Sequence, residues 1–106
     1  MWVYVSMSFS IRSKQRRALC DGFIRELIKD GFSKLYPTMY VRHCATLSNA
    51  MLHRKRVMEN VLPFGKVSII LVADQQADLA YHYCGITNDR KKEKKLPEIP
   101  DLIEFF

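Results

Sequence analysis

A change of hydrophobic period near the start of the chain restricts its fold more than any other feature. Residues 2–9 read WVYVSMSF and alternate between two faces, which is typical of a β-strand. One face carries only apolar side chains and the other a mixture, namely Val3, Val5, Met7 and Phe9 against Trp2, Tyr4, Ser6 and Ser8. From Lys14 onward the apolar residues recur with helical spacing instead. We therefore predict a strand that leads directly into a helix.

The helix is predicted over residues 14–30, after a loop at residues 10–13. Its apolar residues share one half of a helical wheel, and they are Leu19, Cys20, Phe23, Ile24, Leu27 and Ile28. Ser13 suits the N-cap, and Gly31 suits the left-handed position that follows a helix. Residues 32–43 read as strand again. Pro37 interrupts them and cannot donate a ladder hydrogen bond, so it marks an edge, a bulge or a break between two short strands.

The second half of the chain repeats the alternation of helix and strand. Thr46 or Ser48 can cap a helix that ends before Pro63. Residues 66–73 (KVSIILVA) form the most apolar strand, which we expect at the centre of the sheet. Asp74 can cap a short helix that continues through Cys84, so we predict a helix over residues 74–84.

In this second long helix, the apolar arc comprises Leu47, Ala50, Met51, Val57, Met58, Val61 and Leu62. Arg54 falls in the middle of that arc, where it either snorkels to the rim or faces another subunit.

The order of these elements predicts the fold class. Strand, helix, two strands, helix and strand is the βαββαβ order of an α+β ferredoxin-like sandwich. Its helices cover one face of the sheet and leave Trp2 and Tyr4 on the other, an arrangement that favours a homodimer. We divide the 106 residues into a ferredoxin-like domain at 1–85, a basic linker at 86–95 and a C-terminal partner-docking strand at 96–106. The docking residues are Leu102, Ile103, Phe105 and Phe106.

Charge is distributed unevenly along the chain. Residues 1–66 hold 12 Lys and Arg against 4 Asp and Glu, whereas residues 67–106 hold 5 against 7. A group of cations follows the first strand directly, and its members are Arg12, Lys14, Arg16 and Arg17. The helix dipole disfavours cations at a helix N-terminus, so this group requires a counter-anion more than most surface charge does. We predict that it binds the phosphates of nucleic acid.

Other candidate sites are weaker. The run His53-Arg54-Lys55-Arg56 points around a helix, so a solvated face is the favoured interpretation. The three cysteines are widely separated, which favours free thiols in a reducing compartment. His53, His82 and Cys84 match no zinc spacing. The sequence contains no signal peptide and no apolar run long enough to cross a membrane, so we expect a cytoplasmic protein.

An ordered set of short motifs resembles one protein family across nearly the whole chain. The motifs are MWVYV (1–5), KDGF (29–32), YVRHC (40–44), NA…HRKRV (49–57), GKV (65–67), DQ (74–75) and IEFF (103–106). Together they resemble the small second core CRISPR-associated protein (Cas two), in the form that accompanies type II systems. The resemblance implies a ferredoxin-like homodimer that bridges dimers of the CRISPR integrase (Cas one). It also implies that double-stranded DNA is held by its phosphates just after the first strand, and that the C-terminal segment pairs with the integrase or the neighbouring protomer.

The resemblance raises an enzymatic alternative, which one position disfavours. Family members have been called metal-dependent endonucleases, through an aspartate in a pattern like Phe-Asp-x-Pro at the end of the first strand. This chain has Met7-Ser8-Phe9-Ser10 there, so Ser8 stands at the catalytic and metal position. A neutral hydroxyl does not supply the charge that Mg²⁺ draws from carboxylates. We therefore expect a non-catalytic DNA-binding adaptor that needs no cofactor, with a Mg²⁺-dependent endonuclease as the alternative.

Overall fold

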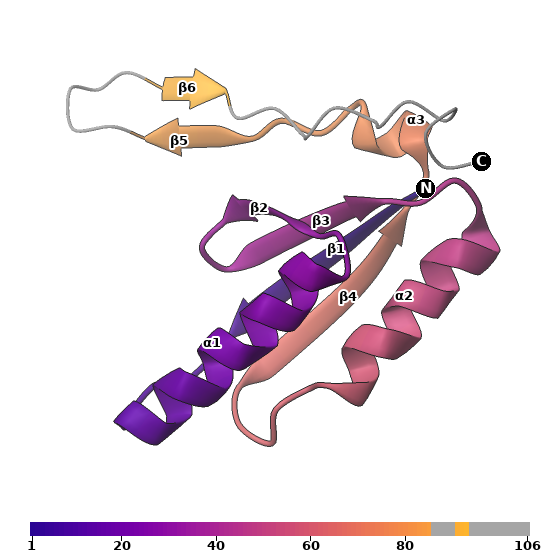
Figure 1. The fold of residues 1–106 in the computed structure, drawn as a ribbon. Coiled ribbons are helices and arrows are strands. Elements are labelled where there is room, and N and C mark those ends of the chain that lie inside the picture. Colours follow the sequence, from indigo (N-terminus) through magenta and orange to yellow (C-terminus); the bar gives the residue numbers. More distant parts are fainter. Residues whose placement is uncertain (86–90, 94–106) are drawn as a thin grey trace.

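A computed structural model describes residues 1–85 and 91–93. The main elements are β1 (Trp2–Ser8), α1 (Lys14–Lys29), β2 (Ser33–Tyr36), β3 (Met39–His43), α2 (Leu47–Glu59) and β4 (Lys66–Val72). A single-turn helix and two short strands follow, and they are α3 (Asp74–Ala77), β5 (Tyr83–Gly85) and β6 (Lys91–Glu93). Figure 1 shows α1 and α2 side by side on one face of the main sheet. No helix among the described residues is long and apolar enough to cross a membrane.

The main sheet confirms the ferredoxin-like fold. Its strand order is β2-β3-β1-β4, and every neighbouring pair is antiparallel. The prediction that β4 is central was wrong, because β4 is an edge of this four-stranded sheet and β1 is internal. Val3 and Val5 of β1 are completely buried, whereas Ile70 of β4 is 53% exposed. Apolar content therefore did not identify the most buried strand. The predicted homodimer stays a prediction.

The predicted ends of the first helix and the break at Pro37 are confirmed. Ser13 caps α1, and its hydroxyl accepts a hydrogen bond from the backbone N–H of Arg16. Gly31 follows the helix with φ +93°, a left-handed conformation that glycine adopts without penalty. Pro37 lies in the turn between β2 and β3, which are separate short strands. These local signals were sufficient because each is decided by neighbouring residues.

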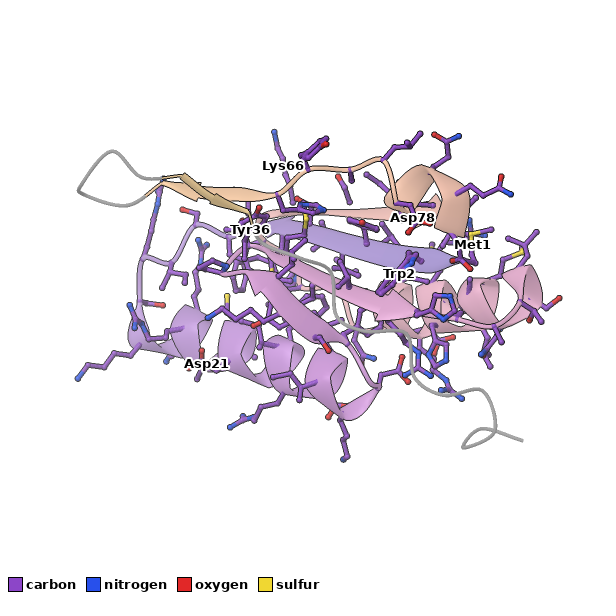
Figure 2. All side chains as sticks on the ribbon, turned by 90° about the horizontal axis from the view of Figure 1, so that it is seen from above. Met1, Trp2, Asp21, Tyr36, Lys66 and Asp78 are labelled. Atoms are coloured by element: carbon purple, nitrogen blue, oxygen red, sulfur yellow. The ribbon has the colours of Figure 1, made fainter. Side chains whose placement is uncertain are left out.

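The second face of the sheet is covered around Trp2 and Tyr4, contrary to the expectation that these two residues lie open. Ser8, Lys66 and Ile70 on the same face are exposed. Both are buried, in a cluster that also contains Leu35 and Val41 of the sheet and Ala77 of α3. Figure 2 shows α3 and residues 78–85 on the side of the sheet opposite α1 and α2. Around Trp2 and Tyr4 the sheet therefore has a second apolar layer rather than an open face.

The predicted helix over residues 74–84 was wrong beyond its first turn. α3 ends at Ala77, and Tyr83–Gly85 pairs as a strand with Lys91–Glu93. Asp74 was expected to cap this helix, but its carboxylate instead binds the N-terminal amine of Met1 and the ring of His43. The strand β6 lies within the predicted linker at 86–95. The remainder of that linker and the segment 96–106 lie outside the described residues.

Helix α2 turns a different side to the core than its apolar arc predicts. Ala50, His53 and Val57 are buried, whereas Met51 and Met58 of the predicted arc are exposed. Burial of the polar His53 side chain is compensated by a contact with a carboxylate. The His53 Nδ1 lies 2.7 Å from a carboxylate oxygen of Asp30, the residue that ends α1. The buried side of α2 is therefore the side that brings His53 into contact with Asp30, and not the side with the most apolar residues.

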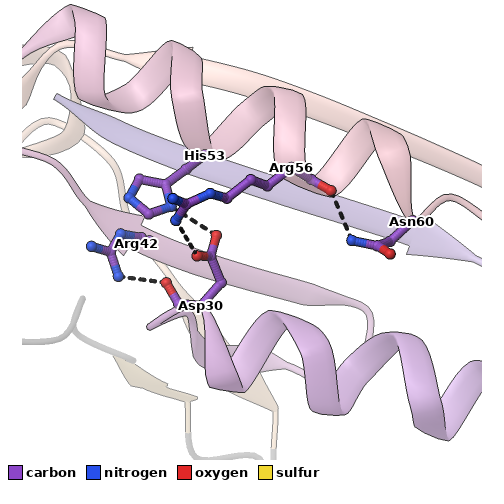
Figure 3. A network of polar contacts seen from close by, with 5 residues as sticks. All are labelled: Asp30, Arg42, His53, Arg56 and Asn60. Carbon is purple, nitrogen blue, oxygen red and sulfur yellow. Dashed lines mark hydrogen bonds and ion pairs between the residues drawn. The ribbon is translucent and has the colours of Figure 1, made fainter.

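Asp30 joins three elements, as Figure 3 shows. Its second carboxylate oxygen accepts a hydrogen bond from Arg56 Nη1 at 3.0 Å, and its backbone carbonyl accepts one from Arg42 Nη1 at 2.5 Å. The run at 53–56 thus does not form one basic patch. His53 is buried, Lys55 is exposed, and Arg56 is neutralised by Asp30. The predicted solvated face is therefore wrong at His53, which is buried, whereas Lys55 and Arg56 are exposed as that interpretation expects.

The Asp74 contacts predict how stability depends on pH. A hydrogen bond from the N-terminal amine lowers the pKa of Asp74, and His43 acts in the same direction. A lowered folded-state pKa means that the stabilisation is complete above about pH 4 and is lost as pH falls through the folded pKa. Because the side chain is 47% exposed, the contribution should not exceed about 1 kcal/mol. Asp74→Asn should therefore lower the free energy of unfolding at pH 7 and converge with the unaltered protein at low pH.

Urea unfolding at a series of pH values between 7 and 2.5 measures this effect. Asp78→Asn is the matched control, because Asp78 is exposed and lies in the turn of chain that ends α3. A constant difference between Asp74→Asn and the unaltered protein at all pH values would contradict the assigned contacts.

Candidate nucleic-acid interface

The site forms where β1 leaves the sheet. Ser8 is the last residue of β1 and is exposed. Phe9 then turns toward the helical layer, where its ring makes edge contacts with Phe23 of α1 and with Phe64. The chain before β4 fits closely against this exit. At Gly65 (φ +84°) a Cβ atom would lie 2.5 Å from the backbone oxygen of Ser8, so only glycine fits there.

Arg16 is held in a defined position at this exit. Its Nη1 donates a hydrogen bond to the backbone carbonyl of Ser10 at 3.2 Å. The centre of its guanidinium lies 4.8 Å from the centroid of the Phe64 ring, within the range of a cation–π contact. Side chains in the first turn of a helix lean toward its N-terminus. Arg16 therefore lies beside the end of the first strand, and its role in binding stays a prediction.

The other three predicted cations surround the same loop. Arg12 Nε donates to the hydroxyl of Ser10 at 3.1 Å, and Lys14 and Arg17 are exposed in the first turn of α1. Within residues 1–82, none of the four predicted cations pairs with a carboxylate. Because the N-terminus of a helix repels positive charge, a bound anion would relieve this arrangement. The loop is thus a concentration of unneutralised positive charge.

Lys66 belongs to the same edge and was missed in the sequence analysis. It is the first residue of β4, and the register pairs it directly with Ser8 across the strands. Its side chain therefore lies on the same face as that of Ser8. Position 66 is distant from residues 12–17 in sequence, so only the pairing of β1 with β4 brings them together. The signal available in the sequence was the GKV start of a strand, which did not reveal its partner.

Ser8 does not lie in surroundings suited to Mg²⁺. Its neighbours in register on that face are Ser6, Ser68 and Lys66, which offer hydroxyls and a cation rather than carboxylates. Mg²⁺ is normally held through one or two carboxylates. No group of three or more His, Cys, Asp or Glu side chains in the described part of the chain is placed to hold a metal ion. The residues at this edge therefore do not fit a Mg²⁺ centre, and they fit an anionic ligand.

The remaining predicted features are only partly described. Cys20 and Cys44 are buried free thiols, as predicted, and burial raises the pKa of both. The docking residues Leu102, Ile103, Phe105 and Phe106 lie outside the described residues, so their role stays a prediction.

Comparison with known proteins identifies relatives of one kind, although no family model matches the chain. The chain is 29% identical over 85 residues to the CRISPR-associated endoribonuclease Cas2 of Flavobacterium psychrophilum, which covers 80% of this chain and 74% of that protein. It is 28% identical over 106 residues to the protein of the same name from Parvibaculum lavamentivorans, along the full length of both. A third, from Paracidovorax avenae, is 26% identical over 96% of this chain and 93% of its own. Together with the ferredoxin-like sheet, this similarity along most of the chain supports placing the chain in the Cas2 family of CRISPR-associated proteins.

Proposed function

We propose that this protein is a non-catalytic DNA-binding adaptor of the CRISPR spacer-acquisition complex, acting in the cytoplasm. A homodimer would bridge subunits of the Cas one integrase and hold a short DNA duplex by its phosphates. Double-stranded DNA and the integrase are thus the proposed partners, with residues 96–106 as the segment that docks on the integrase or on the second protomer.

One observation carries the DNA-binding part of this proposal. The four cations at residues 12–17 surround the exit of β1 without a carboxylate partner among the described residues. Cations of this kind release counterions when they meet phosphate, and they carry no information about base sequence. A surface of this chemistry suits a protein that holds duplexes of any sequence.

A second candidate function is endonuclease activity, favoured by the names of the relatives, which are endoribonucleases. The chemistry of this edge argues against that function in this chain. A hydroxyl at Ser8 and a lysine opposite it do not attract a divalent cation. A Ser nucleophile also requires an adjacent general base, and in the described part of the chain no His, Asp or Glu side chain forms a hydrogen bond with the Ser8 hydroxyl.

One experiment with labelled substrates distinguishes the two functions. Purified protein is mixed with a short DNA duplex or an RNA strand, with and without Mg²⁺ or Mn²⁺, over a range of salt concentrations. We expect the duplex to be bound and left intact, with log affinity falling linearly with log salt and little dependence on base sequence. Ser8→Asp serves as the comparison, since a gain of metal-dependent cleavage in that variant alone would support our interpretation of Ser8.

Two results would overturn the proposal. Metal-dependent cleavage by the unaltered protein that disappears in Ser8→Ala would assign the catalytic function instead. An affinity that does not change with salt would exclude phosphate contacts as the source of binding.

A further inference from the structure

We infer that residues 64–66 form the second half of the phosphate-binding edge, with Lys66 as a direct phosphate contact and Phe64 as the residue that positions Arg16. This inference rests on the proposed function, since it concerns the same ligand. It adds two residues that come from a different element of the fold, the turn into β4.

The position of Lys66 follows from strand pairing. Because Ser8 and Lys66 are opposite each other in an antiparallel pair, their Cβ atoms are separated by roughly 4.5–5.5 Å. Lys66 is exposed and has no carboxylate partner among residues 1–82. The side chain facing it is a neutral hydroxyl, which accepts or donates a hydrogen bond without neutralising the ammonium. Together they offer a phosphate oxygen one charge and one hydroxyl donor.

The position of Phe64 follows from its two ring contacts. The Phe64 ring makes an edge contact with the Phe9 ring, with 6.0 Å between the two ring centroids. This contact holds the Phe64 ring against the exit of β1. Arg16 lies over the Phe64 ring and also donates to the Ser10 carbonyl. A guanidinium has five N–H donors, so these contacts leave others available for a ligand. The ring therefore restricts where Arg16 can point without consuming its charge.

Lys66 and Arg16 lie on opposite sides of the sheet at the end of β1. Figure 2 shows Lys66 on the side of the sheet away from α1. Arg16 belongs to α1 and reaches the exit loop from the helical side. A phosphodiester backbone that crosses the end of β1 would thus meet cations from both layers. This arrangement suits a continuous backbone better than an isolated phosphate, which one side alone would satisfy.

Salt-dependent binding of a short DNA duplex to the full chain tests the role of Lys66. Each phosphate contact contributes about 0.9 to the slope of log affinity against log salt. Lys66→Gln should therefore reduce the slope by about 0.9 for each copy of Lys66 that touches the duplex. By the same relation, affinity should fall about eightfold at 0.1 M salt and only about twofold at 0.5 M. Lys29→Gln is the matched control, because Lys29 is exposed in the last turn of α1, roughly 20 Å from Arg16.

Variants of Phe64 test the positioning role. Phe64→Leu keeps an apolar side chain and removes the ring, which should weaken binding about two- to fivefold, in proportion to an exposed cation–π contact. The effect should vanish when Arg16 is already Gln, and Phe64→Tyr should restore full affinity. A merely structural role would instead lower affinity in the Phe64→Leu variant whether or not Arg16 is present.

The outcomes separate this inference from the function on which it rests. If the unaltered protein does not bind the duplex, the proposed function fails. If it binds normally and Lys66→Gln has the same slope and affinity as Lys29→Gln, only the inference about Lys66 fails. Equal losses for Phe64→Leu with and without Arg16 would overturn the positioning role of Phe64.

Discussion

Replacing Arg16 and Arg17 together with glutamine should weaken binding of a short DNA duplex about sixtyfold at 0.1 M salt. Two lost phosphate contacts should reduce the salt slope by about 1.8, and the affinity scales with salt concentration to that power. The fold should persist, because Arg17 is exposed and Arg16 makes its contacts at the surface of a loop. Fluorescence anisotropy of a labelled duplex, measured at several salt concentrations, gives both the slope and the affinity.

The matched control changes the same charge on the same helix. Arg25 and Lys29 are exposed on α1 but lie beyond its N-terminal half, with Arg25 roughly 13.5 Å along the axis from Arg16. Arg25→Gln with Lys29→Gln should leave the slope nearly unchanged, since only contacted phosphates release counterions. If both double variants lose affinity equally, net charge rather than this site controls binding, and the assignment of residues 12–17 is wrong.

Gly65→Ala should destabilise the protein more than an alanine at either of the other glycines whose surroundings are described, Gly22 and Gly31. The backbone there has φ +84°, which costs an alanine about 1–2 kcal/mol. The new Cβ would also lie 2.5 Å from the Ser8 oxygen and 2.9 Å from Phe9 Cα, which are backbone atoms that move only with the strand. Overpacking of this kind typically costs a further 1–3 kcal/mol. We expect the free energy of unfolding to fall by about 2–5 kcal/mol, measured by urea denaturation.

Gly22→Ala is the opposite case and provides the control. Gly22 lies within α1, and a Cβ there would meet only the end of the Arg25 side chain at 3.8 Å. Alanine is favoured over glycine in a helix by about 0.5–1 kcal/mol, so this variant should be more stable than the unaltered protein. A destabilised Gly22→Ala, or a Gly65→Ala variant as stable as the unaltered protein, would contradict the described packing.

The features that the sequence predicted correctly are those that neighbouring residues determine. The Ser13 cap, the left-handed Gly31 and the break at Pro37 each depend on a few residues along the chain, and all three are present. The element order was sufficient for the fold class, since few sheets accommodate βαββαβ without crossing connections.

The incorrect predictions concern features that depend on contacts between residues distant in sequence. KVSIILVA has the composition of a buried strand, yet β4 lies at the edge and leaves Ile70 exposed. The buried side of α2 depends on the contact of His53 with Asp30, which no helical wheel contains. Asp74 binds Met1 and His43 instead of capping the short helix that was predicted to continue through Cys84. Each outcome required knowledge of a partner distant in sequence, and so did the placement of Lys66 beside Ser8.

The internal position of β1 has a consequence for how the protein is made. The strand β1 and the arginines that follow it come before β4 in the chain, but the pairing of β1 with β4 joins residues from both ends of the core. Contacts of such long range form late, because the intervening chain must first be brought together. A growing chain thus presents its positive charge before it has the turn that orders Arg16. Under the proposed function, capture of a duplex would therefore require the last strand of the core to be in place.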